Sequence, residues 1–143
     1  MKIRNQIFES KQYFETVKKI HESDQLSVMD AYRINYLVKK LNKLNTEYIE
    51  IKKKLLTQYG TPGEEEGLFI VEGENRVSFT KEMKDLLSIE HDLETEALSW
   101  PSKIKDGFSA KDLNTLELFF DMSGLEETLT EEDEQDITST EQE

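Results

Sequence analysis

The longest regular hydrophobic pattern in the chain runs through residues 27–60. Its apolar residues recur at alternating steps of three and four: Ile34, Leu37, Leu41, Leu44, Tyr48, Ile51 and Leu55. This spacing has the 3.5-residue period of a coiled-coil seam and predicts one long helix with a single apolar stripe. Such a helix would be about 50 Å long. We therefore expect its stripe to pack against another segment of the chain or against a second copy.

Local signals define both ends of this helix. Ser27 is the predicted N-cap, and Asp30 lies three residues later, where a capping-box partner belongs. Gly60 is expected to take the left-handed conformation after the last turn, and Pro62 prevents the helix from continuing. The predicted helix therefore spans residues 27–59.

The other regular patterns are shorter. They predict three further helices, at about residues 5–22, 80–100 and 109–120, and one β-hairpin, at about residues 68–79. The hairpin is inferred from two β-prone runs, residues 68–71 and 76–79, on either side of a turn that contains Gly73 and Asn75. The predicted helix at residues 80–100 carries apolar residues at steps of four and three, and Glu90 interrupts this series. This glutamate is expected to face a lysine such as Lys52 or to lie in water.

The lengths of the two longest predicted helices set the expected architecture. The helix at 80–100 would span about 30 Å, which is about 20 Å less than the helix at 27–59. We therefore predict an antiparallel, coiled-coil-like hairpin with the small β-hairpin at its tip and the other helices as a thicker base. The fold class is mainly α, with a single helical domain over residues 1–121. An acidic tail follows at residues 122–143, and the composition of residues 131–143 is typical of disorder.

Charge is concentrated in that tail. The 143 residues include 31 acidic and 18 basic ones, a net charge of −13. From Asp121 onward there are ten acidic residues and no basic one, so the rest of the chain has a net charge of only −3. Because no basic surface emerges, direct binding to nucleic acid or to anionic membranes is disfavoured. No apolar run has the length of a membrane span or a signal-peptide core, so secretion through a signal peptide is not expected.

No motif for catalysis or cofactor binding stands out. The chain has no cysteine, which removes disulfides and thiolate metal sites. His91 and Glu94 have the spacing of two metal ligands on one helix face, but one such pair is common by chance. Gly60, Gly63 and Gly67 do not match the spacing of a phosphate-binding loop. We therefore predict no cofactor, no metal site and no enzymatic activity.

Two groups of residues are candidates for binding a protein partner. The first is an aromatic cluster of Trp100, Phe108, Phe119 and Phe120. It is either the core of the base or a docking patch, because aromatic anchors dominate interfaces. The second is an acidic run of Glu131, Glu132, Asp133, Glu134 and Asp136. It either keeps the protein soluble or tethers it electrostatically to a basic partner.

Several loose motifs lie in the body of the chain. The long helix ends in Leu56-Thr-Gln-Tyr59-Gly60, an acidic stretch with glycines follows, residues 79–87 open the next helix, and a short aromatic segment covers residues 104–120. Together they resemble a group of small, uncharacterised tailed-bacteriophage proteins. The resemblance implies a phage origin, a location in the host cytoplasm or the virion, and a role that is not enzymatic.

The sequence therefore predicts a non-enzymatic protein–protein interaction or assembly component of a tailed phage. Its expected partners are phage structural proteins or a second copy of the chain. The alternative is an acidic inhibitor, or nucleic-acid mimic, that binds a host nucleic-acid-processing protein. The extended acidic run would carry about one charge per 4 Å, a density closer to single-stranded than to duplex nucleic acid.

Overall fold

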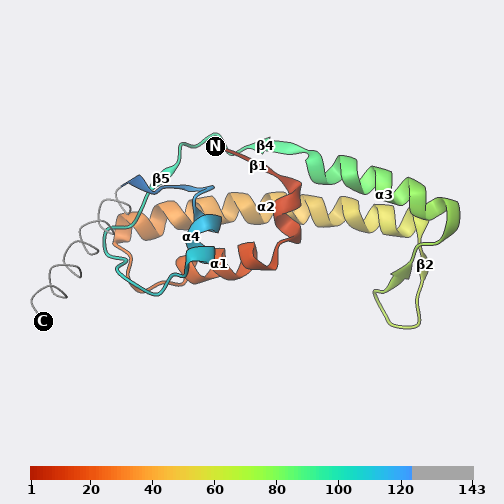
Figure 1. Ribbon diagram of the computed structural model, residues 1–143, viewed down its shortest axis with the longest axis horizontal. Helices are drawn as coiled ribbons and strands as arrows, with labels where there is room; N and C mark the ends of the chain where they lie inside the picture. The colour runs from red at the N-terminus through yellow and green to blue at the C-terminus, as the bar shows by residue number, and fades with distance from the viewer. Residues whose placement is uncertain (124–143) are drawn as a thin grey trace, which may run out of the picture.

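The structure is a computed structural model that describes residues 1–123 and is mainly helical, as the sequence predicts (Figure 1). The predicted tail from residue 124 onward lies outside the described residues. The helices are η1 (a 3-10 helix, Asn5–Glu9), α1 (Lys11–His21), α2 (Val28–Tyr59), α3 (Gly73–Ser88) and α4 (Ala110–Leu116). The strands are β1 (Lys2–Arg4), β2 (Thr61–Pro62), β3 (Phe69–Ile70), β4 (Glu90–Asp92), β5 (Leu98–Ser99) and β6 (Phe120–Asp121). Within residues 1–123 they form three two-stranded sheets.

The long helix α2 forms at the predicted position. Its N-cap is Ser27, whose hydroxyl oxygen accepts a hydrogen bond from the Asp30 amide at 3.1 Å. The prediction for Gly60 is wrong, because its backbone is extended, with φ −101° and ψ 164°. A Cβ atom there would lie 2.6 Å from the Leu56 carbonyl oxygen. Glycine is therefore needed for a close approach, as the chain turns directly into β2, and not for a left-handed conformation.

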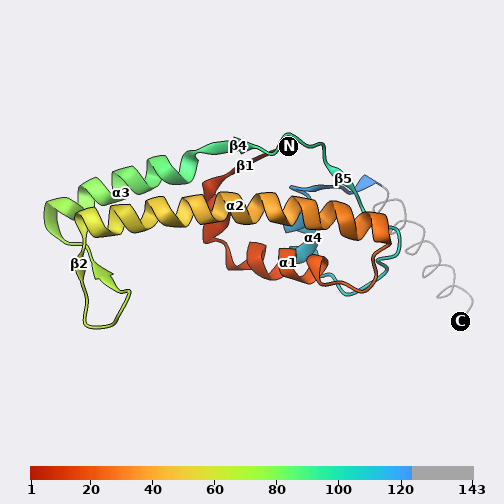
Figure 2. The same cartoon turned by 180° about the vertical axis from the view of Figure 1, so that it is seen from behind.

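The other elements are arranged along α2 (Figures 1 and 2). α3 lies beside the C-terminal part of α2, and α1 and α4 lie beside its N-terminal part. One hydrophobic core connects them. Its buried residues are Ile3, Phe8, Tyr13, Ile20, Ile34, Leu37, Val38, Leu41, Tyr48, Leu86, Leu93, Ile104, Leu116, Phe119, Phe120 and Met122. Met122 belongs to the predicted acidic tail, so the packed body extends further than the sequence predicts.

The apolar stripe of α2 is buried over its first half and opens toward its end. Ile34, Leu37 and Leu41 are buried, and so is Tyr48 further on, but Ile51 is 44% exposed. The first half of the helix has neighbours on several sides. The second half has α3 as its main helical neighbour, and a helix with one neighbour buries a narrower stripe.

The predicted β-hairpin at residues 68–79 is wrong. β3 pairs antiparallel with β2, with Phe69 opposite Pro62, and residues 76–79 belong to α3. Helix α3 starts at Gly73, whose positive φ of 62° a glycine adopts without strain. Packing of an apolar stripe against α2 outweighs the weak β-propensity of the short run.

This correction can be tested at Val77, whose side chain is 74% exposed on α3. We expect Val77→Ala to raise the free energy of unfolding by about 0.5 kcal/mol, because alanine has the higher helix propensity and no packing is lost. Urea denaturation followed by circular dichroism measures the change. A loss of stability would favour a strand at this position, where valine is preferred.

The predicted helix at residues 80–100 ends early, at Ser88. Asn5 explains this end. Its backbone amide donates to the Ile89 carbonyl and its side-chain amide to the Leu86 carbonyl, both at 3.0 Å. The chain that follows α3 therefore continues as a strand beside the N-terminal segment. β4 pairs antiparallel with β1, and Ile3 lies opposite His91.

The same pairing corrects the expectation for Glu90. Its carboxylate faces Lys2 and Arg4 across the sheet, at 3.6 and 3.9 Å, and does not face Lys52. Lys52 pairs instead with Glu9, at 2.6 Å. The interruption of the apolar stripe at Glu90 therefore marks the end of the helix.

The first and last predicted helices are also shorter than expected. Residues 5–22 divide into η1 and α1, because Ser10 is an N-cap whose hydroxyl oxygen accepts from the Tyr13 amide at 3.2 Å. The last helix ends at Leu116, and Phe120 then pairs in parallel with Leu98 in a sheet of β5 and β6. Ser109 caps α4 in a capping box with Asp112.

One buried carboxylate joins α4 to α1. Asp112 accepts hydrogen bonds from three side chains of α1: Gln12 at 2.9 Å, Thr16 at 3.0 Å and Lys19 at 2.8 Å. It also accepts from the backbone amide of Ser109 at 3.0 Å. The contact with Lys19 first, and the hydrogen bonds from the Ser109 amide and the Thr16 hydroxyl after it, hold the pKa of Asp112 well below its usual range, against the opposing effect of burial.

Candidate interaction site

The structure brings together most of the predicted aromatic cluster. Trp100 makes edge-on contacts with Phe108 and with Phe120, each with 5.7 Å between ring centroids. The ring centroid of Phe119 lies 6.3 Å from that of Tyr13, and both Phe119 and Phe120 are buried. This placement favours the interpretation of the cluster as core, and partner binding by these residues stays a prediction. The acidic candidates at 131–134 and 136 lie outside the described residues.

A different apolar surface is exposed on the N-terminal half of α2. It consists of Val28, Met29, Tyr32 and Tyr36, which are 86%, 58%, 70% and 52% exposed. Positions 29, 32 and 36 follow the spacing i, i+3, i+7 and therefore share one side of the helix. We call these four residues the α2 face. Large apolar side chains gathered on a surface are typical of a binding site.

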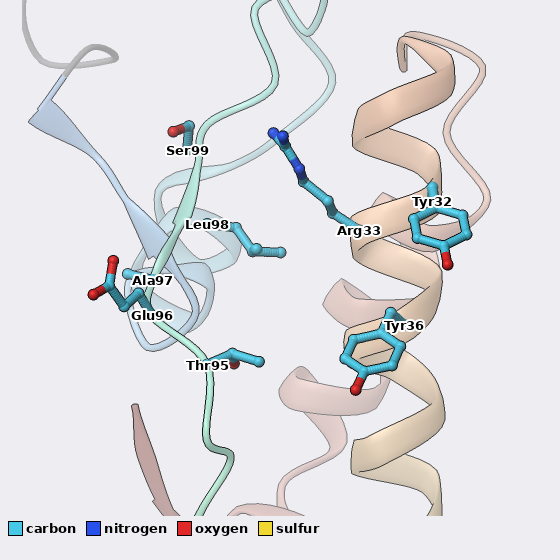
Figure 3. A pocket seen from close by; sticks show the side chains of 8 residues that line it. All are labelled: Tyr32, Arg33, Tyr36, Thr95, Glu96, Ala97, Leu98 and Ser99. Carbon is cyan, nitrogen blue, oxygen red and sulfur yellow. The ribbon is translucent and has the colours of Figure 1, made fainter.

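A groove of about 480 Å³ lies beside the α2 face, between α2 and residues 95–99 (Figure 3). On the helix side it is lined by Tyr32, Arg33 and Tyr36. In Figure 3 the Arg33 side chain extends toward β5, and the side chain of Leu98 points back toward α2. Its volume is within the range of small-ligand pockets, which is also enough for a few side chains of a peptide.

Two polar groups of the groove have no partner among residues 1–123. Among residues 1–123, Arg33 forms no ion pair, and the carboxylate of Glu96 points away from the groove (Figure 3). The hydroxyl of Thr95 is buried and has no hydrogen-bond partner within the described part of the chain. The groove therefore offers one cation without an ion pair and one buried hydroxyl without a hydrogen bond, counted over the described residues.

Lys40 lies one helical turn after Tyr36, next to the residues that line the groove. Its ammonium group donates to the Leu93 carbonyl at 2.8 Å and lies 4.8 Å from the ring centroid of Tyr36. This contact ties α2 to the segment that carries the opposite wall. It also holds the Tyr36 ring in place by a cation–π interaction, so the aromatic wall is partly preorganised.

Metal and membrane sites can be judged for the described residues. No group of three or more His, Asp or Glu side chains in residues 1–123 is placed to hold a metal ion. His91 and Glu94 do not share a helix face, because His91 is in β4 and Glu94 follows it with a positive φ of 56°. The His91 ring forms a hydrogen bond with the Asn5 side chain at 2.7 Å. Over the same residues, no helix combines the length and apolarity needed to cross a bilayer.

Sequence reasoning missed the α2 face and the groove. The spacing of Met29, Tyr32 and Tyr36 was the available signal, but it lies beside the stronger stripe that begins at Ile34. The opposite wall, residues 95–99, falls within the helix predicted at 80–100, so the sequence does not predict a groove there. No protein-family model, curated protein or solved structure matches the chain.

Proposed function

We propose that the protein is a non-enzymatic protein–protein interaction or assembly component that binds its partner through the α2 face and the adjacent groove. The supporting observation is the exposure of four large apolar side chains on one side of α2, next to an arginine without an acidic partner in residues 1–123. Tyrosine and arginine are enriched among the residues that dominate binding energy at interfaces. A surface of this kind is costly to leave in water unless a partner covers it.

The proposal extends to the arm formed by α2 and α3. We infer that the two helices act as an antiparallel, coiled-coil-like hairpin that holds the tip at a distance from the base. The burial of Leu41 and Leu86 supports this arrangement. Leu68 and Ile70 are exposed near the tip, so the arm can carry a second, smaller contact.

The biological setting proposed here follows from the resemblance to tailed-phage proteins. The partners would then be phage structural proteins or a second copy of the chain, and the location would be the host cytoplasm or the virion. Mass spectrometry of purified phage particles tests this setting. Presence of the protein in particles supports a virion component, and its absence favours an assembly factor that is released.

The binding surface is tested by the double variant Tyr32→Ala/Tyr36→Ala. We expect capture of the partner by the tagged full chain to fall at least tenfold, because two exposed aromatic anchors are removed. The melting temperature should change little, since both side chains are exposed. Quantitative pulldown from infected cells, with sedimentation to detect self-association, measures the effect.

Val77→Ala is the matched control, because it removes an exposed apolar side chain of α3, away from the groove. It should capture the partner as well as the wild type. Equal capture by the wild type and the double tyrosine variant would contradict the proposed surface.

The second candidate function is an acidic inhibitor of a host nucleic-acid-processing protein. It is favoured by the ten acidic residues, with no basic one, from Asp121 to the end of the chain. If this run is the effector, changing Glu131, Glu132, Asp133, Glu134 and Asp136 to Gln or Asn should abolish capture. Capture by the wild type should also weaken steeply with salt, which screens exposed charges over about 10 Å at 0.1 M. If the α2 face is the effector, the same change should alter mainly the association rate.

A further inference from the structure

The strand β5 has a free edge beside the groove. Within residues 1–123 it pairs with β6 alone, and the Leu98 amide donates to the Phe119 carbonyl at 2.9 Å. Along a strand, the backbone groups of successive residues face opposite edges. The amide and carbonyl groups of Ala97 and Ser99 therefore face the edge that β6 does not cover, and both residues are exposed. A strand edge with unpaired backbone groups is a template for another extended segment.

The free edge and the side chains of the groove belong to one site. Ala97 and Ser99 line the same groove as Tyr32, Arg33 and Tyr36 (Figure 3). An extended peptide bonded to the edge would present every second side chain toward one face, which is how strand addition combines backbone affinity with side-chain selection. β5 is only two residues long, so backbone bonds alone would hold a peptide weakly and the groove must supply selectivity.

The charge of the groove selects the kind of peptide. Arg33 is the one basic residue among the eight that line it, and Glu96, the acidic one, points away (Figure 3). A carboxylate brought against the Arg33 guanidinium would form charge-assisted hydrogen bonds, in two-pronged geometry when both oxygens are reached. The aromatic rings and Leu98 favour an apolar side chain next to that carboxylate.

We propose that this groove binds an extended peptide segment of another protein, which adds to the free edge of β5 and places an acidic side chain on Arg33 and an apolar one between the tyrosines and Leu98. The assignment rests on the proposed interaction function and names the class of partner for the same site. It predicts a short linear motif as the ligand, in place of a folded surface.

The test uses the ¹⁵N-labelled full chain and a set of eight-residue synthetic peptides. The peptides share a central valine, leucine, phenylalanine or tyrosine, and the flanking residues are glutamate, glutamine or lysine. We expect glutamate peptides to bind with dissociation constants below 1 mM and lysine peptides at least tenfold more weakly, with the amide resonances of Ala97 and Ser99 shifting on binding. Backbone N-methylation of the best peptide, at alternate residues, should abolish binding in one of the two registers and spare it in the other, because only one edge of the peptide donates to β5.

Arg33→Gln should weaken the best glutamate peptide about tenfold and leave its glutamine counterpart nearly unchanged. Lys39→Gln is the matched control, since Lys39 is a basic, exposed residue of the same helix that does not line the groove. It should bind the peptide as the wild type does. Equal losses of peptide affinity for the two variants would show that the effect depends only on the net charge of the protein. That result would overturn the assignment of Arg33.

Other results would assign the groove to a different occupant. If no peptide binds below 1 mM while the tyrosine variant still loses capture of the partner, the interaction function stands and the peptide class is wrong. If neither test shows binding, the proposed function fails as well.

A dimer in sedimentation that Tyr32→Ala/Tyr36→Ala dissociates would assign the groove to a second copy. Peptide binding that is absent from the wild type and appears only when Glu131, Glu132, Asp133, Glu134 and Asp136 are neutralised would assign it to the chain's own acidic run. Each of these results would overturn the proposal of a peptide from another protein.

Discussion

Leu41→Ala should lower the free energy of unfolding by about 2–5 kcal/mol, the range for truncating a fully buried leucine. Leu41 is 0% exposed and lies midway along α2, in the core that also holds Leu86 and Leu93. The chain after β4 is tied to α2 at this point, where the Lys40 ammonium donates to the Leu93 carbonyl at 2.8 Å, so little can move to fill the space that the side chain leaves. Urea denaturation measures the loss. The slope of the unfolding free energy against urea concentration should not change.

Two other residues of the same stripe, Leu44 and Ile51, provide the controls. Leu44 is half-buried and lines a small open groove beside Leu93, so Leu44→Ala should cost less than Leu41→Ala. Ile51→Ala should cost less than about 1 kcal/mol, because Ile51 is exposed and alanine has the higher helix propensity. Equal losses at Leu41 and Ile51 would mean that the exposed end of the stripe is buried as well, by a second copy of the chain.

The position of α2 could be predicted from the sequence because all of its signals are local. The apolar spacing extends over many turns, Ser27 caps the first turn, and Pro62 forbids continuation. Each of these features acts within a few residues of where it is read. The cap of α4 at Ser109 is a local signal of the same kind.

The segment from Gly73 to Ser99 could not be predicted in the same way, because distant residues decide it. The bonds from Asn5 to Leu86 and Ile89 end α3, and they join residues more than 80 positions apart. The steps of four and three continued past Ser88 in the sequence, so the pattern alone indicated a longer helix. Glu90 was the one local signal of the true end.

The candidate site was missed for a related reason. A helix stripe predicts which side chains are buried, but the residues beside it can be either buried or exposed until their neighbours are known. Tyr32 and Tyr36 are exposed because residues 95–99 leave a groove beside them, and the position of that segment depends on the pairing of β4 with β1, the pairing of β5 with β6 and the bond from Lys40 to Leu93. None of these long-range contacts can be inferred from the residues around the two tyrosines.

Asp112→Ala should lower the free energy of unfolding by about 2–3 kcal/mol, because its carboxylate is nearly buried and accepts from four donors. Truncation leaves the buried Thr16 hydroxyl without this acceptor and removes half of the capping box at Ser109. Lys19→Met is the control for charge alone. Because Lys19 is 46% exposed, its loss should cost no more than about 1 kcal/mol. A larger loss for Lys19→Met than for Asp112→Ala would show that the ion pair, and not the buried hydrogen bonds, joins the two helices.

The contribution of Asp112 should also depend on pH, with a sign fixed by its lowered pKa. In the unfolded chain the carboxyl group takes up a proton near its ordinary pKa of 3.8, whereas the folded state keeps it ionised well below that pH. The stabilisation is therefore fully present above about pH 5 and is lost as the pH falls below about 4. Relative to Asp112→Asn, the wild type should lose about 1.4 kcal/mol of unfolding free energy per pH unit in that acidic range. Urea denaturation of both proteins from pH 7 to pH 2.5 measures the difference. A difference that stays constant down to pH 2.5 would mean that the charge of Asp112 does not hold α4 on α1.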